Sequence, residues 1–317
     1  MNSILSKAKL GSQLGARPPA AVELSPQGVL AAATPGAGKP PVYAFEPLPA
    51  GALIPGIGEQ NLRAPEIIAN AMRSALEQVA PRSRSVTLVI PDTVVRVFVL
   101  DFDSLPPKPA EALPVLRFRL RKMVPFEVEH AGLSYQVLTE SKHECRVLAA
   151  LLPGPVLAEY EAVARMAGYE PGAVLPTSLA ALGAIDSLGT ADPDAPILAA
   201  NLSALALTTS ITQGQDLLLY RTLDLPEEPE LRLAEVQRGI AVAAAYYEDK
   251  LGERPRLLYY AGIGAGGNSS AEDFALWIDD AELAVADLAP RPETGAATPL
   301  GNLMSLAGVV GALAGAS

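Results

Sequence analysis

Residues 197–224 read ILAANLSALALTTSITQGQDLLLYRTLD, and this stretch decides the fold class. It contains three apolar runs, which cover residues 197–202, 205–212 and 217–224. Apolar runs of this length, separated by turn residues such as Gln213-Gly214, predict three consecutive β-strands. A long helical pattern over 229–251 follows, and then a buried strand over 256–261 with a glycine-rich exit. The order β-β-β-α-β indicates one α/β lobe.

The first half of the chain repeats this order. Residues 20–32 read as a strand, a turn and a strand, and residues 42–48 as a third strand. Residues 64–80 place apolar side chains at the spacing of a helix with one buried face. Two such units, joined by a polar, proline-containing linker at 190–196, predict a duplicated α/β protein.

We divide the chain into a flexible N-terminal tail (1–17), a first lobe (18–189) and a second lobe (196–317) that ends in a helix. A segment at about 102–140 breaks the rhythm of the first lobe, and we expect a small inserted α+β subdomain there. Just before it, the valine-rich runs 85–90 and 94–101 are expected to pair as neighbouring strands on either side of Pro91-Asp92-Thr93.

Composition excludes several classes of function. The chain has 317 residues, of which 50% are hydrophobic, so it has enough apolar side chains for a buried core. A net charge of −11 repels the phosphate backbone, which argues against nucleic-acid binding. The single cysteine, Cys145, favours a reducing compartment. The apolar C-terminal run is too short to span a bilayer and the first 21 residues lack the apolar run of a signal peptide, so we expect a cytoplasmic protein.

Residues suited to catalysis are scarce. The sequence has no GxxxxGK[ST] motif and no metal-ligand spacing. His130 and His143 have no nucleophile beside them, and the pair Asp101/Asp103 is more typical of a charged strand end than of acid–base catalysis. The residues therefore predict a protein without an active site and without a metal.

The inserted segment carries a family resemblance. Residues 117–138 read RFRLRKMVPFEVEHAGLSYQVL: a basic helix, the step Val124-Pro125-Phe126, acidic residues and an alternating strand. This pattern resembles the inserted subdomain of the PilM family, the actin-like cytoplasmic proteins of type IV pilus assembly. Val89-Ile-Pro-Asp before it and residues 161–182 and 256–264 after it fit the same family, and the resemblance extends over roughly residues 20–315.

The resemblance implies an actin-like (ribonuclease H-like, duplicated) fold whose lobes hold ATP with Mg²⁺ between them. The positions that correspond to its nucleotide loops are Glu23, Ser25, Asn201, Ser203, Gly262 and Gly264. Here Pro26 lacks an N–H group, Asn201 stands where the family usually has Asp, and Ser203 replaces the usual Gly. We therefore expect a degenerate nucleotide cleft, with at most weak ATP binding.

The resemblance also implies a partner, the N-terminal cytoplasmic tail of a PilN-like inner-membrane protein, with other pilus platform or motor components beyond it. An apolar surface rimmed by arginines suits a short extended peptide. The residues that we expect to bind it are Phe102, Leu105, Arg117, Arg121, Pro125 and Phe126. On the helix that carries the arginines, we expect Phe118 to point into the core and Arg117 and Arg121 to point outward.

Two alternatives stay open. One is an ATP-binding switch or slow ATPase of the actin and sugar-kinase superfamily, against which the altered loops at Glu23 and Asn201 argue. The other is the cytoplasmic domain of a type II secretion L-type protein, a relative that carries a transmembrane helix after its actin-like region.

Overall fold

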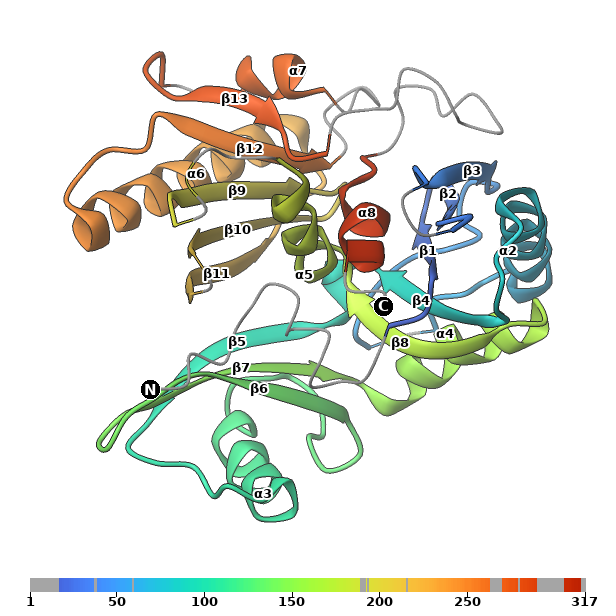
Figure 1. The fold of residues 1–317 in the computed structure, drawn as a ribbon, viewed down its shortest axis with the longest axis horizontal. Coiled ribbons are helices and arrows are strands. Elements are labelled where there is room, and N and C mark those ends of the chain that lie inside the picture. The colour runs from blue at the N-terminus through green and yellow to red at the C-terminus, as the bar shows by residue number, and fades with distance from the viewer. Residues whose placement is uncertain are drawn as a thin grey trace.

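Two five-stranded sheets with the same strand order form the two lobes of the protein (Figure 1). The computed structural model describes residues 17–36, 39–58, 60–188, 192, 194–214, 216–262, 270–278, 280–289 and 305–314. In the first lobe the order is β3-β2-β1-β4-β8. The strands are β1 (Ala20–Ser25), β2 (Gly28–Ala33), β3 (Val42–Pro47), β4 (Ser85–Ile90) and β8 (Glu170–Pro176).

The second lobe repeats this sheet as β11-β10-β9-β12-β13. Its strands are β9 (Pro196–Leu202), β10 (Ala206–Gln213), β11 (Asp216–Asp224), β12 (Leu257–Gly262) and β13 (Ala284–Asp287). In the first sheet β2 is antiparallel to both β1 and β3, and β1, β4 and β8 run parallel. In the second sheet β10 is antiparallel to both β9 and β11, and β9, β12 and β13 run parallel. The predicted duplication is confirmed.

Helices occupy equivalent places in the two lobes. The first lobe has α2 (Pro65–Val79), α4 (Gly154–Met166) and α5 (Thr177–Leu182), and the second has α6 (Pro229–Leu251), α7 (Ala271–Ala275) and α8 (Ala307–Ala314). Helix α2 buries Ile68, Met72, Leu76 and Val79, which the spacing of three or four residues places on one face. The helices predicted at 64–80 and 229–251 are both present.

The inserted subdomain is a three-stranded sheet covered by one helix. It contains β5 (Arg96–Phe102), α3 (Pro109–Leu120), β6 (Gly132–Glu140) and β7 (Cys145–Leu152), in the sheet order β5-β7-β6. The expectation that the two valine-rich runs pair is wrong: β4 pairs with β1 and β8, whereas β5 pairs with β7. A 3-10 turn at Asp92–Val94 separates them, so the subdomain begins at β5 and is wider than the expected 102–140.

The orientation of α3 also differs from the prediction. Ala112, Leu116 and Leu120 are fully buried against the small sheet, whereas Phe118 is 78% exposed. Residues four apart share a helix face, so the Ala112-Leu116-Leu120 series sets the inward face and Phe118 falls on the opposite side. The prediction that Phe118 points inward is wrong.

The last helix, α8, returns to the first lobe and packs on α5, its counterpart in the duplication. Figure 1 shows α8 between the two lobes. The two helices meet at glycine: a Cβ atom on Gly311 would stand 1.9 Å from the carbonyl oxygen of Ala180, and one on Gly183 would stand 2.4 Å from that of Gly311. Only glycine allows the two backbones to approach this closely.

Candidate functional site

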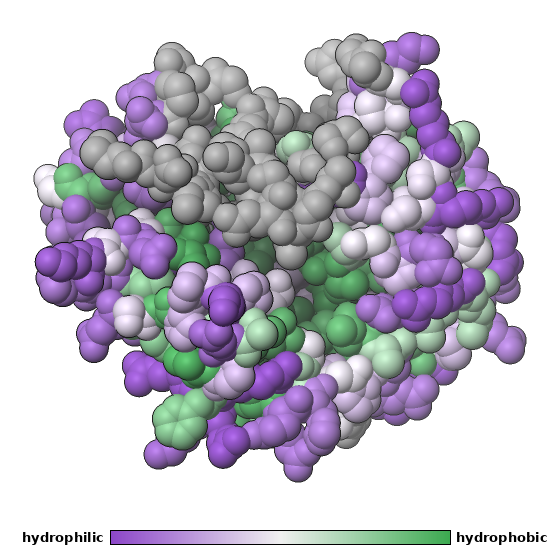
Figure 2. Space-filling model, turned by 60° about the horizontal axis from the view of Figure 1, so that its bottom comes forward, coloured by the Kyte–Doolittle hydropathy of each residue, from purple (hydrophilic) through white to green (hydrophobic). Residues whose placement is uncertain are grey.

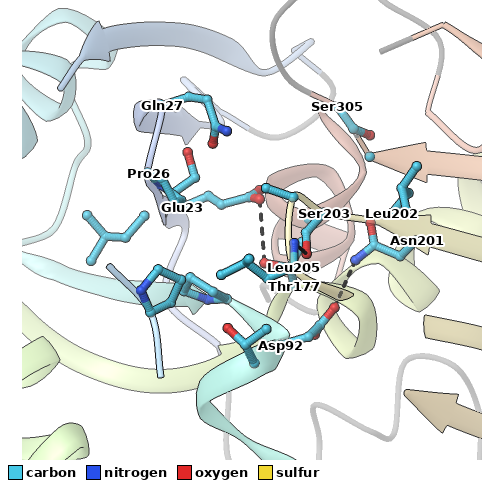
Figure 3. A pocket seen from close by; sticks show the side chains of 18 of the residues that line it. Glu23, Pro26, Gln27, Asp92, Thr177, Asn201, Leu202, Ser203, Leu205 and Ser305 are labelled. Atoms are coloured by element: carbon cyan, nitrogen blue, oxygen red, sulfur yellow. Dashed lines mark hydrogen bonds between the residues drawn. The ribbon is translucent and has the colours of Figure 1, made fainter. Parts of the chain in front are cut away.

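The turns of two equivalent hairpins meet at one cavity between the lobes (Figure 3). The β1–β2 hairpin contributes Glu23 and Ser25, and the β9–β10 hairpin contributes Asn201 and Ser203. Gly262, at the end of β12, lines the same cavity. Five of the six residues predicted from the sequence for a nucleotide cleft are therefore together, and the sixth, Gly264, lies outside the described residues.

Each hairpin serine binds the backbone of its own turn. The Ser25 hydroxyl accepts a hydrogen bond from Gly28 N at 3.3 Å and donates one to Gly28 O at 3.1 Å. The Ser203 hydroxyl likewise accepts from Ala206 N at 3.0 Å and donates to Ala206 O at 3.2 Å. The N–H groups of Gly28 and Ala206 are thus already paired with a side chain of their own turn.

Glu23 is buried and largely uncharged at neutral pH. Its side chain is 7% exposed, and Oε1 accepts a hydrogen bond from the Thr177 hydroxyl at 3.5 Å. Burial raises the pKa of Glu23 to about 8; the charge of Asp92 adds to the rise and the Thr177 hydrogen bond opposes it. Helix α8 closes over the carboxyl, since a Cβ atom on Gly308 would stand 2.4 Å from Oε2.

Asp92, in the turn after β4, connects the two lobes. Its Oδ1 accepts hydrogen bonds from Ser178 N at 3.0 Å and Ser178 Oγ at 2.7 Å. Its Oδ2 accepts from Asn201 Nδ2 at 3.1 Å and from Thr208 Oγ1 at 3.4 Å, and both of these residues belong to the second lobe. Burial raises the pKa of Asp92, and these four hydrogen bonds oppose the rise. The carboxyl is therefore committed to protein groups on both sides.

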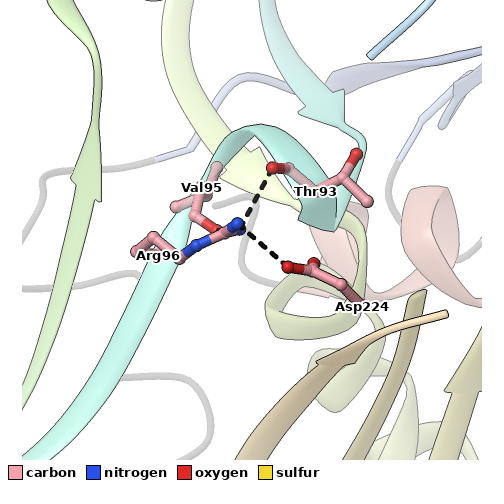
Figure 4. A network of polar contacts seen from close by, with 4 residues as sticks. All are labelled: Thr93, Val95, Arg96 and Asp224. Atoms are coloured by element: carbon pink, nitrogen blue, oxygen red, sulfur yellow. Dashed lines mark hydrogen bonds and ion pairs between the residues drawn. The ribbon is translucent and has the colours of Figure 1, made fainter. Parts of the chain in front are cut away.

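Two further contacts join the lobes beside this turn. Ser178 Oγ is hydrogen-bonded to the hydroxyl of Tyr220 on β11, whose pKa burial raises well above its ordinary value. Arg96, at the start of β5, donates to the carbonyl oxygens of Thr93 and Val95 and forms an ion pair with Asp224 at 3.2 Å (Figure 4). The root of the inserted subdomain is thus fixed to the end of β11.

Gly262 is required by packing. Its φ is +137°, and a Cβ atom there would stand 2.0 Å from the carbonyl oxygen of Leu202. β12 ends tightly against β9 at this point, where Gly262 pairs with Leu202. The glycine is explained by the strand contact, whatever the cavity holds.

The cavity itself is small, with a volume of about 60 Å³. This is room for about two water molecules, whereas sites for small organic ligands have volumes of about 300 Å³ or more. The lining includes the apolar residues Leu24, Leu202 and Leu205 beside the two carboxyl groups.

A second and much larger hollow lies between the inserted subdomain and the edge of the first lobe. Its volume is about 570 Å³, and we call it the subdomain groove. One wall is the face of the small sheet opposite α3, where Gln136 lies beside its cross-strand partner Leu148 and Ser134 beside Ala150. The other wall is β8 and the start of α5, from Gly172 to Leu179. Figure 2 looks at the molecule from the side of α3. It shows hydrophobic side chains gathered around a hollow in the middle of the surface in view.

The predicted partner-binding residues do not form one surface. Leu105 lines the subdomain groove, and Phe102 packs against the core of the small sheet. Arg117 donates to the carbonyl oxygens of Val128 and Ala131 and so supports the turn after α3. The remaining three residues, Arg121, Pro125 and Phe126, surround an open depression of about 520 Å³ at that turn. Arg121 forms an ion pair with Glu129 there.

Sequence reasoning missed two residues that organise these sites. Asp92 stands in Pro91-Asp92-Thr93, which reads as an ordinary turn; its only signal is an acidic residue at the end of a buried strand next to the hairpins. Arg17 was assigned to a flexible tail, but its side chain is 6% exposed and lines the subdomain groove. A charged residue before a strand gives no signal that it will be buried.

Among the described residues, no three His, Cys, Asp or Glu side chains are grouped so that they could hold a metal ion. No helix within the described ranges is both long enough and apolar enough to cross a membrane.

Comparison with known proteins places the fold. No family model matches the chain, and no curated protein matches it. Among solved structures, it is similar to a chain of the PilM–PilN type IV pilus biogenesis complex, with a TM-score of 0.69 and 19% identity over 94% of this chain and 98% of that one. It also matches the cytoplasmic domain of EpsL, an inner-membrane component of the Vibrio cholerae type II secretion system, with a TM-score of 0.48 and 13% identity over 93% and 92%. Together with the repeated strand order, the first likeness confirms the two-lobe actin-like fold with an inserted subdomain.

Proposed function

We propose that this chain is a PilM-like cytoplasmic scaffold of type IV pilus assembly, and that its subdomain groove binds the N-terminal cytoplasmic tail of a PilN-like inner-membrane protein. Through this partner it would sit beside the inner membrane and link the membrane platform to other pilus components. The observation that carries the proposal is the groove, because it is the large apolar hollow in a fold shared with a chain of a PilM–PilN complex.

The shape and lining of the groove suit an extended peptide. Its volume of about 570 Å³ is within the range of ligand sites, and most of the residues that line it are Leu, Val, Ala or Pro. One wall, β8, is the last strand in the order of its sheet, and an extended peptide can bind along such an edge through main-chain hydrogen bonds. This moves the expected contact from the arginines of α3 to the opposite face of the same subdomain.

The cleft between the lobes contributes rigidity in this proposal, and the chain is not an enzyme. Support comes from the cavity of about 60 Å³, from a protonated Glu23 and from an Asp92 carboxyl already bound by protein groups. A triphosphate with Mg²⁺ needs ionised oxygen ligands and free N–H groups. Here burial favours the neutral carboxyl of Glu23, and the N–H groups of Gly28 and Ala206 are paired within their turns.

The partner is tested by calorimetric titration of the purified protein with a synthetic peptide, the N-terminal cytoplasmic tail of the PilN-like protein from the same organism. Ser134 is exposed on the groove face, so Ser134→Trp fills the groove without removing a buried contact. We expect wild type to bind, Ser134→Trp to lose binding, and Ser134→Ala and Arg121→Glu to bind as wild type does. Loss of binding in Arg121→Glu alone would move the site to the turn after α3.

The cleft is tested by the same titration with Mg-ATP at high protein concentration. No heat of binding is expected. Binding with a micromolar Kd would instead support the ATP-binding switch, and it would make Glu23 and Asn201 the first residues to substitute.

A further inference from the structure

Two residues that line the subdomain groove each have a buried hydrogen-bond donor without an acceptor among the described residues. The guanidinium Nε of Arg17 and the amide Nε2 of Gln136 are buried, and neither has a hydrogen-bond partner among the described residues. A buried donor without an acceptor is costly, because it has lost water and gained nothing in exchange. Two of them in one cavity point to something that the cavity binds.

Of the two residues, Arg17 is the one that carries a charge. Its Nη1 donates to the carbonyl oxygen of Gly311 on α8 at 3.4 Å, which leaves the charge itself uncompensated. No carboxylate of the described chain forms an ion pair with it, and burial lowers its pKa with no acidic neighbour to oppose the shift. A buried guanidinium is normally paired with an anion.

Gln136 lies on the other wall of the groove. It lies on β6 directly opposite Leu148, so its side chain is on the sheet face away from α3. Arg17 enters from the side of β8, since the next residue, Pro18, is in contact with Gly172 at the beginning of that strand. The groove therefore has a positive group on one wall and a neutral amide donor on the other.

One acidic residue also lines the groove. Glu140 is the one carboxylate among the described lining residues, and it lies at the far end of β6 from Gly132. Glu140 repels an acidic ligand group, and the charge of Arg17 attracts it. The rest of the lining, which includes Val174 and Leu179, is apolar.

We propose that the subdomain groove selects an apolar extended peptide with one carboxylate side chain, which Arg17 and Gln136 bind between them. This rests on the proposed function only in taking the groove as a peptide site; the acidic anchor is a separate property. A charge-assisted hydrogen bond from arginine to carboxylate satisfies the buried charge, and the amide of Gln136 binds the second carboxylate oxygen.

The anchor is tested by selecting eight-residue peptides from a random phage-displayed library on wild type, on Arg17→Met and on Arg119→Met. Arg119 is an exposed arginine of α3 outside the groove and serves as the matched control. Peptides that still bind Ser134→Trp are discarded, because they bind elsewhere. We expect wild type and Arg119→Met to enrich peptides with Asp or Glu at one fixed position, and Arg17→Met to lose that preference.

A double-mutant cycle then measures the contact directly. The Kd of the best acidic peptide and of its Asp→Leu version is measured by fluorescence anisotropy. The change to Leu should weaken binding to wild type about tenfold or more and binding to Arg17→Met little. Gln136→Glu should weaken the acidic peptide more than Gln136→Leu does, because it adds repulsion.

Three results overturn the inference: no enriched peptide, enrichment without an acidic residue, or equal weakening in wild type and Arg17→Met. If the PilN-like tail fails to bind while acidic peptides bind, the proposed function fails and the anchor stands. If the tail binds wild type and Arg17→Met equally, the anchor fails and the proposed function stands.

Discussion

The carboxyl of Asp92 accepts a hydrogen bond from the side-chain amide of Asn201 at 3.1 Å, and this contact joins the end of β4 to the end of β9 across the two lobes. An aspartate at position 201, as the PilM resemblance leads one to expect, would place two carboxyl groups in contact at the same point. The amide replaces that repulsion with an attraction that needs no ion. Asn201 therefore holds the lobes together directly.

Asn201→Asp tests this arrangement. At neutral pH without divalent ions we expect it to lower the free energy of unfolding by about 2 kcal/mol or more, because a second buried carboxylate faces Asp92. Adding Mg²⁺ or lowering the pH should recover most of the loss. Asn201→Ala is the control: it removes the same hydrogen bond and adds no charge, so Mg²⁺ should leave it unchanged. Urea unfolding measures each case, and an equal Mg²⁺ response in both variants would contradict the explanation.

Glu23 should make the protein less stable as the pH rises. Its pKa is raised from 4.5 to about 8 by burial, so between these values the folded chain holds a proton that the unfolded chain releases. Unfolding then releases a proton, and a rise in pH favours the unfolded chain. The contribution approaches about 1.4 kcal/mol for each pH unit. Urea unfolding at about pH 5.5 and about pH 7.5 should show a smaller fall in stability for Glu23→Gln than for wild type. An identical fall would mean that Glu23 is ionised in the fold.

The two faces of α3 should respond differently to truncation. Leu116 is fully buried and Phe118 is 78% exposed. We expect Leu116→Ala to cost about 3 kcal/mol of unfolding free energy through the cavity that it leaves, and Phe118→Ala to change it by less than about 0.5 kcal/mol. Thermal unfolding of the two variants decides the orientation, since the opposite order would require α3 to be turned by about half a revolution.

Arg17→Met should stabilise the protein in the absence of a ligand. The substitution removes a buried charge that no described carboxylate compensates, and methionine fills a similar volume. We expect a gain of about 1 kcal/mol in the free energy of unfolding, less the hydrogen bond to Gly311. Urea unfolding without peptide measures it. A clear loss of stability would show that Arg17 serves to hold α8 in place, and it would remove the reason to expect an anion beside it.

Much of the fold could be predicted from local patterns. Apolar runs on either side of short turns indicate the hairpins around Ser25 and Ser203, and their repetition along the chain indicates the duplication. Helix α6 has the bounds expected from its sequence, because Pro229 suits the first turn of a helix and Gly252 suits the left-handed conformation at its end. The strand pairing of β5 was predicted wrongly, because neighbouring strands in sequence usually pair and only the sheet as a whole shows that the turn at Asp92 leads into another sheet.

The candidate site was predictable to the extent that it lies in those hairpins. Glu23, Asn201 and Gly262 meet as expected, since equivalent strands of the two lobes end at the same place. The partners of Asp92 could not be predicted, because Ser178 and Thr208 come from elements that are 86 and 116 residues away along the chain. The inward face of α3 follows from the Ala112-Leu116-Leu120 spacing, a series that Phe118 does not share.

The packing of α8 on the first lobe has a consequence for synthesis. One buried cluster contains Ala21 and Leu30 together with Val309 and Ala312, which are made nearly 300 residues later. Until α8 leaves the ribosome, the first lobe has an uncovered apolar surface and cannot complete its core. The two lobes therefore complete their cores together, after α8 has been made, and a chaperone that shields this surface during translation should raise the yield of native protein.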